Sequence, residues 1–186
     1  MTEHFIRYYE NVVDDEFCDN LIEKFEQNED KHLSIKSGDK FSFKELRLLD
    51  HLDAFQDEAH TLKDLFMACV KTYKEDCKIT PEMFPQSVGY ENFRMKRYMP
   101  DGIDQFDNHV DVGDYASARR FLVFFLYLNE VEGGETAFEQ YGLKVEPKKG
   151  RLLVFPPMWT HLHAGRKPIN KPKYIVGSYL HYLDKE

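Results

Sequence analysis

Residues 120–138 of the chain read RFLVFFLYLNEVEGGETAF, and this stretch decides the fold class. A run of aromatic and aliphatic residues fills positions 120–128, two glycines follow at Gly133 and Gly134, and a second short run comes after them. Short apolar runs that are separated by glycine turns are typical of antiparallel strands. We therefore predict strands at 120–128 and 136–138, with a tight turn ahead of the second.

The same pattern extends from Ser87 to the end of the sequence. Turn signals such as Pro-Asp-Gly at 100–102 and Pro-Lys-Lys-Gly at 147–150 separate the apolar runs. Aromatic residues make up 15% of the chain, and large rings suit the half-buried surface of a pleated sheet. Further strands are therefore predicted at residues 89–99, 105–112, 143–146, 151–155, 160–165 and 173–182.

Residues 5–13 are predicted to form a short strand, and most of the chain between this strand and Ser87 has helical spacing of its apolar side chains. Asp14-Asp15 supplies N-cap chemistry for an amphipathic helix with its apolar residues on one stripe. Residues 29–50 are polar and contain a single β-like piece. A second, longer helix is predicted over residues 53–77, where Asp53 serves as the N-cap.

Two helices followed by about eight strands predict a mainly β fold with flanking helices. The expected architecture is an antiparallel double sheet or barrel of the jelly-roll type, with the N-terminal helices packed on one outer face. A chain of 186 residues fits the usual size of one domain. We expect a single domain, with a helical support region at 1–86 and a β core at 87–186.

Composition argues against several classes of partner. A net charge of -8 does not supply the basic face that phosphate binding needs, so no nucleic-acid partner is expected. The sequence starts without a basic and then apolar leader, and the longest apolar run, 121–128, is too short to span a bilayer. The three cysteines form no C-x-x-C pair. We expect a cytoplasmic protein with reduced thiols and no membrane partner.

A candidate metal site begins at His109-x-Asp111. Residues two apart in a strand leave the same face, so this imidazole and this carboxylate can reach one ion. His51-x-Asp53 has the same spacing, but it lies at the start of the predicted long helix and nothing nearby completes a coordination sphere. A His-x-Asp pattern therefore indicates a metal site only where further ligands accompany it.

Further ligands for His109 and Asp111 follow the predicted strand at 151–155. The sequence WTHLHAG at 159–165 brings His161 and His163 to a strand edge, and spacing in a strand does not choose between them. Two imidazoles and one carboxylate leave three coordination positions open. Open positions on this donor set suit ferrous iron that binds O2 and a chelating substrate, whereas a structural zinc site is closed.

Several ordered motifs give the second half of the chain a family resemblance. They are His109-x-Asp111, the stretch from Arg120 through Phe138, VEPKKGRLLVF at 145–155, His163-Ala-Gly, Pro168 and Lys173-Tyr174. From about Tyr90 to Tyr182 this order resembles the prolyl 4-hydroxylase-like branch of the Fe(II)/2-oxoglutarate dioxygenases, particularly its small bacterial and viral members. The fold of that family is a double-stranded β-helix, which agrees with the jelly roll predicted above.

The resemblance implies roles for individual residues. His109 and Asp111 are the first two iron ligands. In the family the third ligand is the histidine of the His-Ala-Gly segment and the 2-oxoglutarate-binding lysine follows ten positions later, which matches His163 and Lys173. Tyr98 stands where the family has a tyrosine whose hydroxyl contacts 2-oxoglutarate, although its distance to the first ligand is two residues longer than usual.

Further expectations concern the co-substrate anchor and the substrate groove. A turn near Pro168 would set His163 and Lys173 opposite each other on antiparallel strands, and the lysine would pair with the remote carboxylate of 2-oxoglutarate. Arg120 matches a family arginine near the peptide-binding groove, and Arg119 beside it could serve equally. A lysine anchor favours the hydroxylases over the nucleic-acid demethylases of the superfamily, whose anchor is an arginine.

The predicted function is that of an Fe(II)- and 2-oxoglutarate-dependent dioxygenase. Such an enzyme uses O2 to hydroxylate a C–H bond and releases succinate and CO2, with ascorbate (vitamin C) as the expected reductant. The resemblance implies a prolyl residue in a peptide or protein as substrate, and a free amino acid is the alternative. The non-enzymatic alternative is a jelly-roll module that binds a metal or a carboxylate without turnover.

Overall fold

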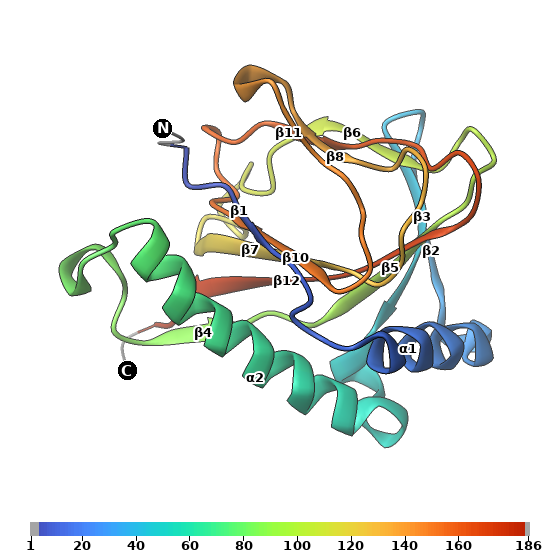
Figure 1. Ribbon diagram of the computed structural model, residues 1–186, viewed down its shortest axis with the longest axis horizontal. Helices are drawn as coiled ribbons and strands as arrows, with labels where there is room; N and C mark the ends of the chain where they lie inside the picture. The colour runs from blue at the N-terminus through green and yellow to red at the C-terminus, as the bar shows by residue number, and fades with distance from the viewer. Residues whose placement is uncertain (1–3, 185–186) are drawn as a thin grey trace.

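The structure is a computed structural model that describes residues 4–184 (Figure 1). Its helices are α1 (Asp15–Gln27) and α2 (Leu52–Asp76), with short 3-10 helices at Glu29–Lys31, Leu48–His51, Pro81–Met83 and Glu139–Tyr141. Its strands are β1 (Arg7–Tyr9), β2 (Leu33–Ser37), β3 (Phe41–Arg47), β4 (Val88–Tyr90), β5 (Arg94–Tyr98), β6 (Gln105–His109), β7 (Arg120–Tyr127), β8 (Thr136–Phe138), β9 (Leu143–Val145), β10 (Arg151–Phe155), β11 (His163–Gly165) and β12 (Lys173–Tyr182).

The strands form one antiparallel sheet that curls into a nearly closed barrel. Their order is β1-β10-β7-β12-β5-β3-β6-β11-β8-β9, with β2 paired to β3 and β4 paired to β12. In Figure 1 the layer of β7, β10 and β12 faces the layer of β6, β11 and β8. β3 joins the two layers, because residues 44–47 pair with β5 and residues 41–42 pair with β6. The predicted jelly roll is confirmed.

Strand β7 explains why this sequence makes a filled barrel with helices outside it. Leu122, Phe124 and Leu126 belong to the core that lies under the helices, whereas Val123 and Phe125 point to the core inside the barrel. Alternate side chains leave opposite faces of a strand, so a strand that is buried on both faces needs a continuous apolar run. The quoted stretch supplies that run.

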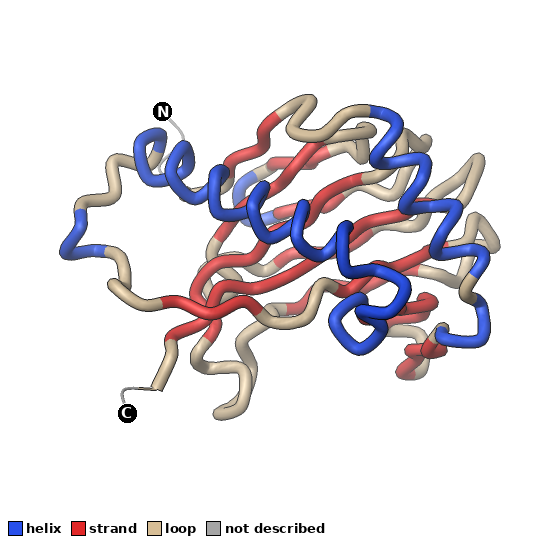
Figure 2. The backbone as a smooth tube through the Cα atoms, turned by 90° about the horizontal axis from the view of Figure 1, so that it is seen from below, coloured by secondary structure: helices blue, strands red, loops and turns tan. Residues whose placement is uncertain are grey.

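Both helices pack across the same outer face of the sheet, as predicted (Figure 2). α1 begins where the sequence indicates, because the Phe17 backbone N–H donates to Asp14 Oδ1 at 2.7 Å. On α2, the ring of Phe66 stacks on Phe124 of β7 with centroids 4.9 Å apart and planes 10° apart. No helix within residues 4–184 is long and apolar enough to cross a bilayer.

Some sequence-based boundaries are wrong. The predicted strand at 89–99 is broken into β4 and β5, because Asn92 turns away to bond the Leu49 N–H and Asp50. Asp53 is not the N-cap of α2, since a 3-10 turn that ends at His51 leads directly into the helix. β1 lies within the strand predicted at residues 5–13 and β3 includes the predicted β-like piece, but β2 and its hairpin with β3 were not predicted.

The expected pairing of His163 with Lys173 is also wrong. β11 pairs with β6 and β8, and β12 pairs with β5 and β7, so the two residues lie in different layers of the barrel. The loop between them crosses from one layer to the other. His163 instead pairs with His109, and Lys173 pairs with Tyr98.

We predict that the Phe66–Phe124 contact is a main source of helix docking. Phe66→Ala removes a fully buried ring and should lower the free energy of unfolding by about 3–5 kcal/mol in urea denaturation. The matched variant Met67→Ala removes a neighbouring side chain that is 45% exposed, and should change the free energy by less than about 0.5 kcal/mol. Similar losses in both variants would contradict this account of docking.

Candidate metal centre

The structure brings His109, Asp111 and His163 together where β6 meets β11. His109 ends β6 and His163 begins β11, and the two residues face each other in antiparallel register with ring centroids 4.3 Å apart. Asp111 follows two residues after β6, where its backbone N–H donates to the Pro157 carbonyl at 3.1 Å. One donor atom from each of the three side chains lies within 4.8 Å of the others.

Backbone carbonyls orient both imidazoles. Nδ1 of His109 lies 2.7 Å from the Asp107 carbonyl, and Nδ1 of His163 lies 3.0 Å from the His161 carbonyl. A carbonyl oxygen only accepts, so each Nδ1 carries the proton and each Nε2 keeps its lone pair when the ring is neutral. Both Nε2 atoms point at the Asp111 carboxylate, 3.5 Å from Oδ1 for His109 and 3.5 Å from Oδ2 for His163.

Two atoms of this cluster are buried without a partner. Among residues 4–184, neither Oδ2 of Asp111 nor Nε2 of His163 has a hydrogen-bond partner, which is costly for buried polar atoms. Burial lowers the pKa of His163 to about 4, more than Asp111 raises it, so the ring is neutral at pH 7. Burial acts to raise the pKa of Asp111, but the two imidazoles and the Tyr179 hydroxyl outweigh it and hold the pKa below its ordinary value. A carboxylate beside two free imidazole nitrogens fits a divalent cation.

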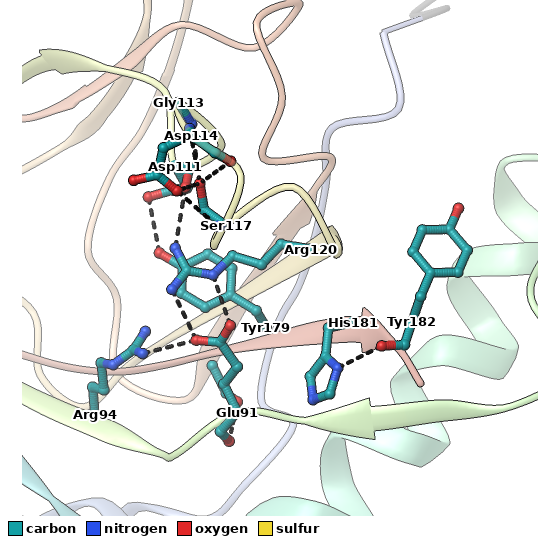
Figure 3. A network of polar contacts seen from close by, with 11 residues as sticks. Glu91, Arg94, Asp111, Gly113, Asp114, Ser117, Arg120, Tyr179, His181 and Tyr182 are labelled. Atoms are coloured by element: carbon teal, nitrogen blue, oxygen red, sulfur yellow. Dashed lines mark hydrogen bonds and ion pairs between the residues drawn. The ribbon is translucent and has the colours of Figure 1, made fainter. Parts of the chain in front are cut away.

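Asp111 is held from the other side by Tyr179 and Arg120 (Figure 3). The Tyr179 hydroxyl donates to Asp111 Oδ1 at 2.8 Å, and Arg120 Nη1 donates to the Asp111 backbone carbonyl at 3.1 Å. The Arg120 guanidinium also lies over the Tyr179 ring, 4.3 Å from its centroid. Sequence reasoning missed Tyr179, although its even spacing from Lys173 on one strand places both on the interior face.

Glu91 engages the guanidinium of Arg120. Glu91 accepts from Arg120 Nε at 2.8 Å, from Arg120 Nη2 at 3.0 Å and from Arg94 Nη2 at 2.7 Å, and its side chain is 8% exposed. Burial acts to raise the pKa of Glu91, but the two guanidinium groups outweigh it and keep the pKa below its ordinary value. Arg120, predicted to lie near a substrate groove, is thus anchored within the protein and lines a surface hollow beside Asp111.

A small cavity beside the three residues also contains Lys173 and Tyr98. The Lys173 ammonium lies over the Tyr98 ring, 4.5 Å from its centroid, and donates to the Gly134 carbonyl at 2.8 Å. Gly134 has a φ of +70°, and a Cβ there would stand 3.0 Å from Cδ of Lys173. This glycine therefore gives the lysine room as well as making the turn expected from the sequence.

His161 lies outside the cluster. Its Nε2 donates to the His4 carbonyl at 2.6 Å, and its Nδ1 accepts from the Thr160 hydroxyl at 2.8 Å. Both nitrogens are therefore in use. The sequence left His161 and His163 open as alternatives, and only His163 is placed beside Asp111 and His109.

Comparison with known proteins finds a family that part of the chain matches. Residues 93–181 match the family described as the 2OG-Fe(II) oxygenase superfamily. The matched segment is just under half of the chain and contains His109, Asp111, His163 and Lys173. No curated protein sequence matches it. The family and the fold together identify a 2-oxoglutarate-dependent dioxygenase, as the sequence predicted, and the family implies Fe(II) and 2-oxoglutarate.

Several solved structures with a similar fold are prolyl hydroxylases. A viral collagen prolyl hydroxylase from Paramecium bursaria Chlorella virus-1 has a TM-score of 0.66 at 20% identity, with 96% of this chain and 97% of that chain covered. A prolyl hydroxylase from Trichoplax adhaerens, in complex with a hypoxia inducible factor peptide fragment, has a TM-score of 0.72 at 14% identity, with 96% and 84% covered. A Pseudomonas putida prolyl-4-hydroxylase has a TM-score of 0.67 at 16% identity, with 97% and 94% covered. At these identities the likeness is one of fold.

We predict that Glu91 stabilises the support behind Asp111. Glu91→Gln leaves Arg94 and Arg120 without their shared carboxylate and should lower the free energy of unfolding at pH 7 by about 2–3 kcal/mol. The folded pKa of Glu91 lies below its ordinary value, so the difference from wild type should shrink as the pH falls below about 4. The control is Glu75→Gln on the exposed side of α2. Equal stability of the two variants would contradict the prediction.

Proposed function

We propose that the protein hydroxylates a prolyl residue of a peptide or protein, with Fe(II) on His109, Asp111 and His163. Oriented imidazoles and an unpaired carboxylate oxygen support this ligand set. Two histidines and one carboxylate leave room for a chelating co-substrate and O2. When bound, the iron supplies the oxidation chemistry that couples O2 and 2-oxoglutarate to C–H hydroxylation, with succinate and CO2 as products.

Lys173 and Tyr98 are the residues that we propose hold 2-oxoglutarate. Both line the cavity beside the ligand set, and Lys173 is 2% exposed. Burial, followed by the nearby Lys96, lowers the pKa of Lys173 to about 7. A carboxylate placed against the amine would favour its charged form, because an opposite charge stabilises the ammonium. The pocket would thus pair with the remote end of a dicarboxylate while the other end meets the metal.

Support for a peptide substrate comes from the surface next to Asp111. Arg120 lines a hollow there. Three of its N–H groups donate to Glu91 and to the Asp111 carbonyl, and its other N–H groups remain available to a substrate. Nearby loops carry Tyr115, 98% exposed, and Trp159, 80% exposed. Exposed aromatic rings are typical contacts for extended, proline-containing peptides. The prolyl hydroxylases of similar fold agree with this choice of substrate.

The first test is release of succinate from 2-oxoglutarate with Fe(II) and ascorbate as reductant. We expect metal-dependent turnover by the wild-type protein and at least a hundredfold loss in Asp111→Ala, because the only carboxylate of the described ligand set is removed. Mass spectrometry of a peptide library after reaction would identify the hydroxylated residue. Absence of metal-dependent succinate release, with or without peptides, would favour a non-catalytic binding module. Hydroxylation confined to free amino acids would overturn the peptide assignment.

The two histidines of the 159–165 segment give a matched pair of variants. His163→Ala should abolish binding of one Mn(II) per chain, because it removes a nitrogen that faces Asp111. His161→Ala should keep Mn(II) affinity within about threefold of wild type, because its nitrogens bond to His4 and Thr160. Titration calorimetry measures both. Loss of the ion in His161→Ala alone would make His161 the ligand.

A further inference from the structure

Lys96 is a buried cation to which the proposed function gives no role. It lies on β5, two residues before Tyr98, so both side chains point into the barrel. Its neighbours in register are Glu45 on β3 and Ile175 on β12. The residue is only 8% exposed, which is rare for a lysine without a partner.

The ammonium group of Lys96 lies among aromatic rings. Its Nζ is 4.7 Å from the centroid of Phe43 and 5.7 Å from that of Phe106. The described residues offer it neither a hydrogen bond nor an ion pair within 4 Å. Glu45, the carboxylate across the strand pair, instead accepts from Arg47 at 2.9 Å. Ring faces attract a cation but leave its N–H groups without acceptors.

Lys96 and Lys173 line the same small cavity as His109, Asp111 and His163. Burial is the main reason that the pKa of Lys173 falls to about 7, and the ammonium of Lys96 is the next. Two cations that share a cavity with few acceptors disfavour each other. An anion bound between them would remove the repulsion and fill the unmet N–H groups.

The two lysines differ in which side of the cavity they approach. Lys173 lies over Tyr98 and bonds to the Gly134 carbonyl. Lys96 lies toward Phe106, whose ring stacks on His109 with centroids 3.6 Å apart and planes 7° apart. Lys96 is therefore the lysine that lies nearer to the three proposed metal ligands.

We propose that Lys96 is a second cationic contact for 2-oxoglutarate, at the metal end of the pocket, while Lys173 binds the remote carboxylate. This inference rests on the proposed function. 2-Oxoglutarate is a dianion with a carboxylate at each end, so two lysines match its two charges. A packing role for the aliphatic stem alone would not require an amine at this position, since methionine has a similar length and no charge.

The experiment is calorimetric titration of 2-oxoglutarate into the Mn(II)-loaded protein without O2. We expect Lys96→Met and Lys173→Met each to weaken binding by at least tenfold, while Lys44→Met, at a half-buried position on β3 outside this cavity, stays within twofold of wild type. Mn(II) affinity without 2-oxoglutarate should not fall in Lys96→Met, because that change removes a positive charge from beside the ion. The same titration with pyruvate, which lacks the remote carboxylate, should be weakened by Lys96→Met and unchanged by Lys173→Met.

The outcomes separate this inference from the proposed function. If the wild-type protein binds Mn(II) and 2-oxoglutarate and only Lys173→Met weakens the co-substrate, the role of Lys96 is overturned and the proposed function stands. If Lys96→Met weakens 2-oxoglutarate but not pyruvate, its assignment to the metal end is overturned. If the wild-type protein binds neither Mn(II) nor 2-oxoglutarate, both proposals fail. Thermal melting of each variant checks that a loss of affinity is not a loss of fold.

Discussion

The register between β6 and β11 is the constraint on which the candidate site depends. Antiparallel pairing sets His163 directly across from His109, and a backbone bond from Asp111 to Pro157 then brings the carboxylate between the two rings. A shift of one residue would turn one imidazole to the opposite face of the sheet. β6 and β11 are short, and β3 holds them in place because it pairs with β5 in one layer and with β6 in the other. This pairing fixes the β6 layer over the filled core around β7.

Charge inside the barrel follows from this arrangement. The side chains of Asp111, Lys96 and Lys173 are buried around one cavity, where water cannot screen them well. The protein balances the carboxylate from behind with the Tyr179 hydroxyl and the Arg120–Glu91 pair, so Asp111 stays ionised and its orientation is fixed. Among the described residues, neither Lys96 nor Lys173 has a carboxylate within 4 Å of its amine, although Lys173 donates to the Gly134 carbonyl. The cavity thus contains three oriented side chains that can ligate a metal and two lysines without a carboxylate partner. These groups are suited to a divalent metal together with a dianion.

Much of the fold was predictable, because it depends on local pattern. The apolar run at 120–128 and the turns around it indicate strands, and the strands at Thr136–Phe138, Arg151–Phe155 and Lys173–Tyr182 match in both bounds. The hairpin of β2 and β3 was not predicted, although apolar and polar residues alternate over 33–37 and 41–44 on either side of the turn at Gly38. The pairing of β11 with β6 rather than β12 is a long-range choice that turn chemistry near Pro168 does not determine.

The residues of the candidate site were likewise only partly predictable from the sequence. His109, Asp111, His163 and Lys173 were predictable because ordered motifs fix them, and the structure places them around one cavity. Tyr179 and Lys96 carry no motif, and only their even spacing from Lys173 and Tyr98 on the interior face of two strands hints at them. Strand spacing alone does not choose between His161 and His163; the His-Ala-Gly motif favours His163, and the structure agrees because both ring nitrogens of His161 bond elsewhere.

The central claim is that these residues form one metal and co-substrate site. Anomalous diffraction from crystals that contain Mn(II) and 2-oxoglutarate tests it most directly. The account predicts one manganese peak, within about 2.3 Å of His109 Nε2, His163 Nε2 and an Asp111 carboxylate oxygen, with 2-oxoglutarate density that reaches Lys173. A manganese peak bound instead at His161, or 2-oxoglutarate density outside this cavity, would contradict it.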